Sequence, residues 1–161
     1  MKKSTVILLT STVPIILLVL FTVSYGIYMY INHDMYIKDF YRDIKYDRLD
    51  AVKAKIDNDP ELLNTRTSLH TTPLQEAVWH GSNQTVQHLL SIGCNRDETW
   101  RINGPHDGYT LLHIVAIQGH QETCEMFIQQ GCRTDLPSKD GTKPIDIARQ
   151  NGHQHLIDLL K

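Results

Sequence analysis

The chain has 161 residues, a formal net charge of −2 and a hydrophobic fraction of 41%. This length allows one domain or two small ones. A charged fraction of 21% is typical of a folded protein rather than of a disordered chain. The near-neutral charge argues against nucleic acid as a partner, because phosphate recognition needs a basic surface.

An apolar segment occupies the amino terminus. From Val6 to Ile31 the chain has 26 consecutive residues without a formal charge, and a helix needs about 20 apolar residues to cross a bilayer. Its end carries three tyrosines, Tyr25, Tyr28 and Tyr30, and aromatic rings of this kind favour the membrane interface. The sequence therefore predicts a transmembrane anchor over residues 1–31, followed by a linker over residues 32–39.

The location of the rest of the chain depends on whether this segment is cleaved and on its orientation in the membrane. Lys2 and Lys3 precede it, and Ser24-Tyr25-Gly26 offers small residues for cleavage, so a secreted protein is the alternative to an uncleaved anchor. We expect a cytoplasmic amino terminus and an extracytoplasmic body, which in a bacterium means a single-pass inner-membrane protein with a periplasmic domain. The opposite orientation would make the body a cytoplasmic adaptor at the membrane.

The body of the chain contains a repeat. Three segments share an apolar pattern and carry a glycine nine residues after their first residue: Thr72-Pro73-Leu74-Gln75-Glu76-Ala77 with Gly81, Thr110-Leu111-Leu112-His113-Ile114-Val115 with Gly119, and Lys143-Pro144-Ile145-Asp146-Ile147-Ala148 with Gly152. A second apolar pattern at helical spacing follows each glycine, and a fainter copy begins at Asp47. Each copy predicts a pair of helices that buries its apolar face only by stacking on its neighbours.

This pattern resembles the ankyrin repeat, a unit of about 33 residues with the signature Thr-Pro-Leu-His-x-Ala. The resemblance covers nearly all of residues 40–161 and divides them into units of about 40–66, 67–104, 105–138 and 139–161. It implies an all-α solenoid of four helix pairs with short hairpin fingers, in which the first and last pairs are atypical caps. Thr72 and Thr110 are placed to cap the first helix of a pair, and Gly81 and Gly119 to end it.

No pattern in the sequence points to a reaction centre. His113 stands at the signature position, and His120 and His153 directly follow repeat glycines, so the repeat explains all three. A metal-assisted hydrolase that uses the histidines is the enzymatic alternative, and it needs three or four convergent ligands. Catalytic signatures are absent from the sequence. We therefore expect no enzymatic activity, no cofactor, no metal ion and no small-molecule substrate.

The resemblance implies that a protein partner docks against the fingers and the inner faces of the first helices. Carried over residue by residue, the candidate contact residues are Leu69, Thr71, Trp79, His80, Trp100, Arg101, His106, Asp107, Tyr109, Ile117, Gln118, Lys139 and Asp140. Five extra residues in or near residues 97–105 enlarge the second finger, and insertions of this kind often map to the binding face.

Four of these residues are predicted to form one contact patch: Trp79, Trp100, Arg101 and Tyr109. We expect Trp100 and Arg101 at the tip of the enlarged finger, because these residue types are enriched at interface hot spots. The alternative is that Trp79 packs beneath a neighbouring finger.

The sequence thus predicts a non-catalytic, membrane-tethered module that captures or occludes a protein partner. Small envelope-anchored ankyrin proteins of bacteria include immunity proteins that neutralise secreted toxic effectors. The resemblance therefore implies a toxic effector as one class of partner.

Overall fold

The computed structural model describes residues 3–100 and 108–161, with side chains from residue 17 onward. The chain divides into two compact units, residues 1–38 and residues 39–161. In the described ranges every regular element is a helix, and one isolated antiparallel bridge joins Thr99 to Thr110. The prediction of an all-helical fold is confirmed.

The first helix, α1, runs from Lys3 to Lys45. Residues 32–39, predicted as a linker, therefore have helical backbone. Every residue from 17 to 31 is exposed, including the large apolar side chains of Leu18, Phe21 and Ile27. Among the side chains that are described, no helix has both the length and the hydropathy of a membrane span. Residues 6–16 of the predicted anchor lie outside that set.

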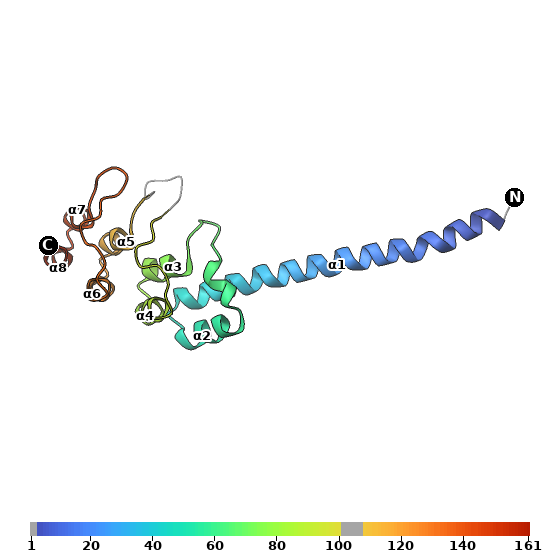
Figure 1. The fold of residues 1–161 in the computed structure, drawn as a ribbon, viewed down its shortest axis with the longest axis horizontal. Helices are drawn as coiled ribbons and strands as arrows, with labels where there is room; N and C mark the ends of the chain where they lie inside the picture. The colour runs from blue at the N-terminus through green and yellow to red at the C-terminus, as the bar shows by residue number, and fades with distance from the viewer. Residues whose placement is uncertain (1–2, 101–107) are drawn as a thin grey trace. The chain divides into compact units, whose positions relative to one another are not determined.

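The helices of the second unit form two rows (Figure 1). One row contains α3 (Pro73–His80), α5 (Leu111–Gln118) and α7 (Pro144–Gln150). The other contains α2 (Leu49–Asn58), α4 (Asn83–Ser91), α6 (Gln121–Gln129) and α8 (Gln154–Leu159), with the 3-10 helix η1 (Pro60–Asn64) after α2. Both rows contribute side chains to a shared core, such as Val78, Ile114, Leu89, Phe127 and Leu156, all fully buried. Burial of this apolar surface against neighbouring pairs stabilises the stack.

Local sequence signals fix where the inner helices begin and end. The Thr72 hydroxyl accepts a hydrogen bond from the Gln75 backbone N–H at 3.1 Å, and the Gln75 side chain accepts one from the Thr72 N–H at 3.0 Å. This capping box satisfies two backbone donors at the start of α3, and Pro73 follows where no N–H is needed. Gly81 then ends α3 at φ 66°, in the left-handed region that glycine adopts without strain.

The first helix pair is built differently, because its inner helix is the end of α1. Phe40 and Ile44 in this segment are fully buried. Its Asp43 carboxylate accepts a hydrogen bond from the Lys55 ammonium of α2 at 2.6 Å, and its Tyr41 hydroxyl donates to the Thr65 carbonyl at 2.9 Å. Residues 39–45 and α2 therefore make the first of four stacked pairs.

Candidate protein-binding surface

Three hairpin fingers connect the helix pairs, and equivalent backbone hydrogen bonds close their necks. Thr67 N–H donates to the Thr71 carbonyl at 3.0 Å, Trp100 N–H to the Tyr109 carbonyl at 2.7 Å, and Ser138 N–H to the Thr142 carbonyl at 2.8 Å. The paired residues are four positions apart in the first and third fingers and nine apart in the second. The prediction of an enlarged second finger is therefore confirmed, and the five extra residues lie between Trp100 and Tyr109.

The position of Trp100 differs from the prediction. Its side chain is only 5% exposed, and its backbone closes the neck of the second finger, so it does not stand at the tip. Its ring lies 5.9 Å from the ring of Trp79 on α3, centroid to centroid. Trp79 is half-buried, which fits the alternative in which it packs under a finger.

The predicted contact patch is thus partly assembled at the base of the second finger. Trp79 and Trp100 are in ring contact, and Tyr109 is paired to Trp100 through the backbone. The half-buried Tyr109 ring also stacks on His113 at 4.9 Å. Arg101, His106 and Asp107 lie outside the described residues.

The other candidate contact residues are distributed along the fingers and the ends of the inner helices. Leu69, His80, Lys139 and Asp140 are exposed, and Ile117 and Gln118 are half-buried. Thr71 is an exception, because it is 2% exposed and its hydroxyl donates to Glu76 at 2.7 Å. The Thr71 side chain is therefore engaged inside the scaffold.

His113 links neighbouring units of the stack. Its Nδ1 accepts a hydrogen bond from the Thr110 N–H at 3.0 Å, so Nε2 carries the proton and donates to the Thr142 carbonyl in the next finger at 2.9 Å. Burial lowers the pKa of His113, although the hydrogen bond to Thr142 acts in the opposite direction. Gln75 of α3 has the same structural role, because its amide donates a hydrogen bond to the Thr99 carbonyl at 3.3 Å. Gln75 occupies the signature histidine position, which is the signal that identifies its role.

His120 and His153 fasten each unit to the turn before it. The His120 Nε2 lies 3.4 Å from the Trp79 carbonyl, and the His153 Nε2 lies 3.3 Å from the Ile117 carbonyl. Each ring covers a glycine, and a Cβ built on Gly119 would lie 2.7 Å from His153 Cε1. Both histidines therefore occupy equivalent positions in the scaffold of the repeat.

Two junction residues carry no signature in the sequence. The Ser82 hydroxyl donates to the Ile44 carbonyl at 2.7 Å. The Asp47 carboxylate accepts hydrogen bonds from Thr85 N–H at 2.9 Å and from the Thr85 hydroxyl at 2.7 Å, at the start of α4. Asp47 has a φ of 51° where the later units have glycine. Both residues join the first pair to the second.

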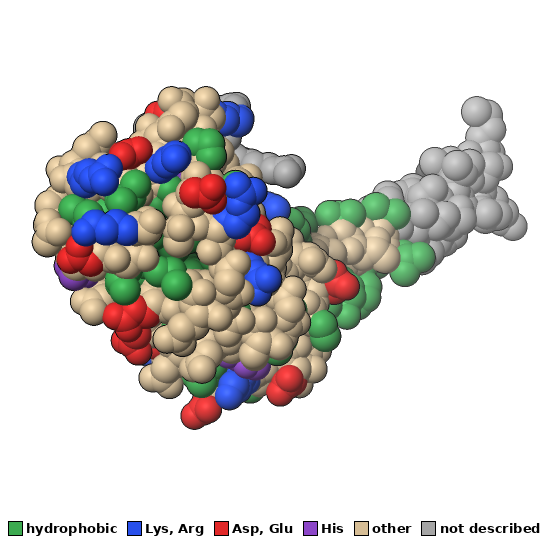
Figure 2. Space-filling view, turned by 60° about the vertical axis from the view of Figure 1, so that its left-hand side comes forward, with side chains coloured by type: hydrophobic (Ala, Val, Ile, Leu, Met, Phe, Trp, Pro, Cys, Tyr) green, Lys and Arg blue, Asp and Glu red, His purple; other side chains and the backbone are tan. Residues whose placement is uncertain are grey.

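Within the residues that the structure describes, no group of three or more His, Cys, Asp or Glu side chains is placed to hold a metal ion. Cys94, Cys124 and Cys132 are free thiols, and burial raises the pKa of Cys132 to about 11. Figure 2 shows basic, acidic and apolar side chains interspersed on one face of the second unit. This mixed surface is typical of protein interfaces rather than of nucleic-acid sites.

Comparison with known proteins agrees with this architecture. A family model described as ankyrin repeats, in three copies, matches residues 74–161. The chain is 34% identical over 83 residues to the human Notch-regulated ankyrin repeat-containing protein, covering 52% of this chain and 72% of that protein. It is 31% identical over 104 residues to a Caenorhabditis elegans homolog of transient receptor potential cation channel subfamily A member 1, covering 65% of this chain. A human ARF GTPase-activating protein, GIT1, is 33% identical over 87 residues, or 54% of this chain.

The fraction of each relative that the matched segment covers differs widely. The matched segments span 8% of the channel homolog and 11% of the GTPase-activating protein, so the likeness to those two is confined to a small part of each. The family match covers more than half of this chain and coincides with its last three helix pairs. The chain belongs to the ankyrin-repeat family.

Proposed function

We propose that this chain is a membrane-tethered protein-binding module whose ankyrin stack captures or occludes a protein partner. Ankyrin repeats imply protein partners. One observation supports this role most directly: the polar signature residues are engaged inside the scaffold, whereas the residues that differ between units face solvent. His113, His120 and His153 all bond backbone carbonyls of neighbouring units. Exposed Leu69 and Lys139 occupy the tips of the first and third fingers.

The docking surface consists of the finger tips and the carboxyl ends of α3 and α5. Half-buried apolar side chains, Trp79 and Ile117, lie there beside the polar His80 and Gln118. An apolar centre with a polar rim is the usual composition of a protein interface. Large aromatic side chains contribute most of the binding energy at such sites.

Site-specific photocrosslinking tests the docking surface. A photoreactive amino acid replaces Leu69 in one variant, Lys139 in a second and Gln129 in a third; Gln129 is exposed on α6, in the opposite row. The first two variants are expected to crosslink a protein partner in cells, and the third is not. Crosslinking from Gln129 alone would contradict the proposed surface.

Membrane tethering is supported by the apolar character of the amino-terminal segment. Fifteen residues, 17–31, have exposed side chains and no formal charge, and the uncharged sequence extends back to Val6. Water is an unfavourable environment for so many neighbouring apolar side chains. A lipid bilayer would surround such a helix on all sides. The charged side chains of Lys2 and Lys3 would then remain in the aqueous phase.

Extraction of membranes with alkaline carbonate tests the tether. The full chain is expected to remain with the lipid, whereas Val19→Arg is expected to release it in part, because an arginine inside a bilayer costs about 2.5–3.5 kcal/mol. Ala54→Arg is the matched control, since Ala54 is exposed on α2. Equal extraction of all three proteins would contradict a hydrocarbon location for residue 19.

We further propose that the ankyrin unit lies outside the cytoplasm. The half-buried thiols of Cys94 and Cys132 serve as reporters of its side of the membrane. A membrane-impermeant maleimide is expected to label them once the outer envelope is permeable. Labelling only after rupture of the inner membrane would instead indicate a cytoplasmic adaptor, and a mature mass that lacks residues 1–26 would indicate secretion.

The narrower proposal is that the partner is a secreted toxic effector. Co-expression of the chain with such an effector is expected to restore growth. A chain with Trp79→Ala and Ile117→Ala, folded by circular dichroism, is expected to lose this protection.

A further inference from the structure

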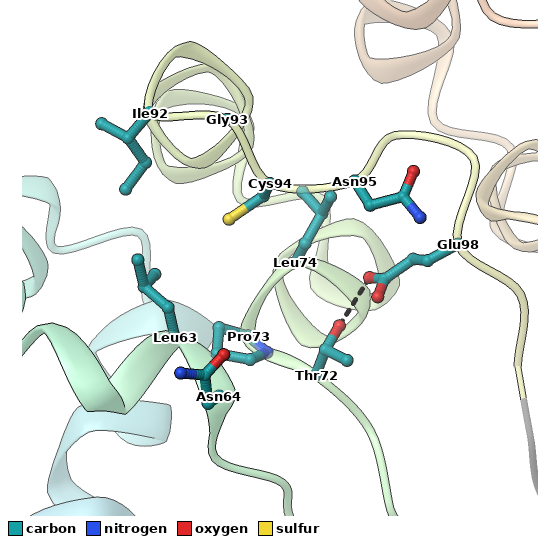
Figure 3. Close-up of a pocket in the computed structure, with 10 residues that line it drawn as sticks. All are labelled: Leu63, Asn64, Thr72, Pro73, Leu74, Ile92, Gly93, Cys94, Asn95 and Glu98. Atoms are coloured by element: carbon teal, nitrogen blue, oxygen red, sulfur yellow. Dashed lines mark hydrogen bonds between the residues drawn. The ribbon is translucent and has the colours of Figure 1, made fainter.

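A pocket of about 300 Å³ is lined by residues outside the proposed docking surface (Figure 3). Three segments of the first two helix pairs line it: Leu63 and Asn64 at the end of η1, residues 72–74 at the start of α3, and residues 92–95 with Glu98 after α4. None of the residues predicted to contact a partner contributes to its wall. The pocket is therefore distinct from the predicted contact residues, although Pro73 and Leu74 of α3 contribute to its wall.

The two ends of the pocket differ in polarity. Leu63 and Ile92 form one end, and Ile92 is 43% exposed although it is a large apolar residue. Glu98 stands at the other end, where its Oε1 accepts a hydrogen bond from the Thr72 hydroxyl at 2.6 Å. The Cys94 sulfur points into the space between these ends (Figure 3).

The second oxygen of Glu98 is available to a ligand. Among the residues that the structure describes, no hydrogen bond or ion pair reaches its Oε2. Burial raises the pKa of Glu98, while the Thr72 hydrogen bond and the charge of Arg66 lower it. A half-buried carboxylate with one unused oxygen favours a cation that enters the pocket, because the cation restores the interactions lost with water.

The fold does not require this carboxylate. The position 38 residues later in the chain, in the equivalent turn after Gly131-Cys132, is Leu136. Leu136 is also half-buried, so the next unit forms the same turn with an apolar side chain. Ile92 likewise corresponds to the exposed polar residue Gln130. The combination of an apolar end and an acidic end is thus specific to the second unit.

We propose that this pocket binds a basic side chain of a protein partner, an arginine or a lysine. These side chains combine an apolar stem with a terminal cation. The stem would lie along Leu63 and Ile92, and the cation would bond Glu98 Oε2. The inference rests on the proposed function as a protein-binding module, and it adds a second contact made by residues outside the proposed docking surface.

Protection of Cys94 from alkylation tests the pocket directly. The full chain in detergent is treated with iodoacetamide at alkaline pH, and modification is followed by mass spectrometry. Cys132 is the internal control, because it is the equivalent residue of the next unit and is also half-buried. The probes are the acetylated methylamides of arginine and lysine, with the neutral citrulline derivative as the isosteric control for arginine.

At about ten times its dissociation constant, a bound probe is expected to slow alkylation of Cys94 about tenfold, since only the unoccupied fraction reacts. Alkylation of Cys132 should not change, and citrulline should protect neither thiol. Glu98→Leu places the residue of the next unit in this turn and should abolish protection without loss of folding. Comparison of the arginine and lysine probes identifies the preferred cation.

Three results would overturn the proposal: no protection by either cation, equal protection by arginine and citrulline, or retained protection in Glu98→Leu. The assay needs no partner, so it is independent of the proposed docking surface. Variants of the fingers that lose a partner should still show protection of Cys94 by the probe.

Discussion

The junctions between helix pairs are of two kinds in this chain. In the two later junctions, His120 and His153 each place an imidazole over the glycine of the preceding turn and approach a backbone carbonyl. In the first junction Ser82 makes the contact to a carbonyl, and Asp47 stands where the glycine is expected. A small hydroxyl suffices there because the carboxylate of Asp47 also holds the start of α4. All three junctions thus contain a side chain that approaches a backbone carbonyl of the preceding unit, but the side chain is a serine in the first junction and a histidine in the later two.

The largest effect is expected from Gly119→Ala. Its φ of 78° is strained for alanine, and the new Cβ would lie 2.7 Å from His153 Cε1, so the ring must move and weaken its contact with the Ile117 carbonyl. We expect a loss of about 2–4 kcal/mol in the free energy of unfolding. Gly152→Ala is the matched control, because its φ is 73° and nothing lies within 4 Å of the added Cβ.

Urea denaturation of both variants measures this difference. Gly152→Ala is expected to lose only about 1–2 kcal/mol, the cost of the left-handed backbone. Equal losses in the two variants would show that the imidazole adapts freely, and that the later junctions do not depend on a close approach.

Replacement of Asp47 gives the next largest effect. Asp47→Ala removes the hydrogen bonds to Thr85 and keeps a φ of 51°, and we expect it to cost about 2 kcal/mol. Asp47→Gly loses the same bonds but relieves the backbone, so it should cost about 1 kcal/mol less. Thermal unfolding ranks the two variants. If glycine were the more destabilising replacement, the left-handed conformation would not be a source of strain.

Acid should weaken the contact between units that His113 makes with Thr142 more than the contact that Gln75 makes with Thr99. Burial lowers the pKa of His113 below its ordinary value of 6.5, so the folded state binds fewer protons than the unfolded state. The contribution of His113 to the free energy of unfolding is therefore fully present above about pH 6.5. It is lost as the pH falls through the lowered pKa of the folded state. His88, whose pKa burial also lowers, contributes with the same sign.

Urea midpoints measured across this pH range test the assignment. His113→Gln is expected to flatten the pH dependence, because glutamine keeps an acceptor and a donor without titrating. His88→Gln is the control for a histidine outside the junctions. An unchanged profile in His113→Gln would place the acid sensitivity elsewhere.

Local chemistry explains which features the sequence predicts. Thr72, Pro73 and Gly81 specify the limits of α3 through groups within a few residues of one another, so the pattern alone identifies the helix. The inner helix of the first pair has none of these signals, and Asp47 replaces its terminal glycine. The sequence therefore predicts a first unit that begins near residue 40 but does not indicate that its inner helix continues the helix before it.

Contacts between distant segments were harder to predict. The length of the insertion indicates an enlarged finger, but only the pairing of Trp100 with Tyr109 shows that Trp100 lies at the neck. The pocket beside Glu98 combines three segments from two helix pairs, and no motif links them. The alignment of the repeats predicts which residues occupy equivalent positions in different units. A site that occurs in one unit alone depends on residues that differ from the repeat pattern, and the alignment does not predict it.

Exchange of one junction for the other provides the smallest and most specific test. Ser82→His introduces the residue of the later junctions, but the Cβ of Asp47 occupies the space that a glycine leaves open in them. Ser82→His alone should therefore be destabilising, and in the Asp47→Gly background it should be less so. We expect a coupling of about 1 kcal/mol between the two positions in a double-mutant cycle measured by urea denaturation. Additive effects would mean that the imidazole does not need glycine beneath it, and that the two kinds of junction differ only in their hydrogen bonds.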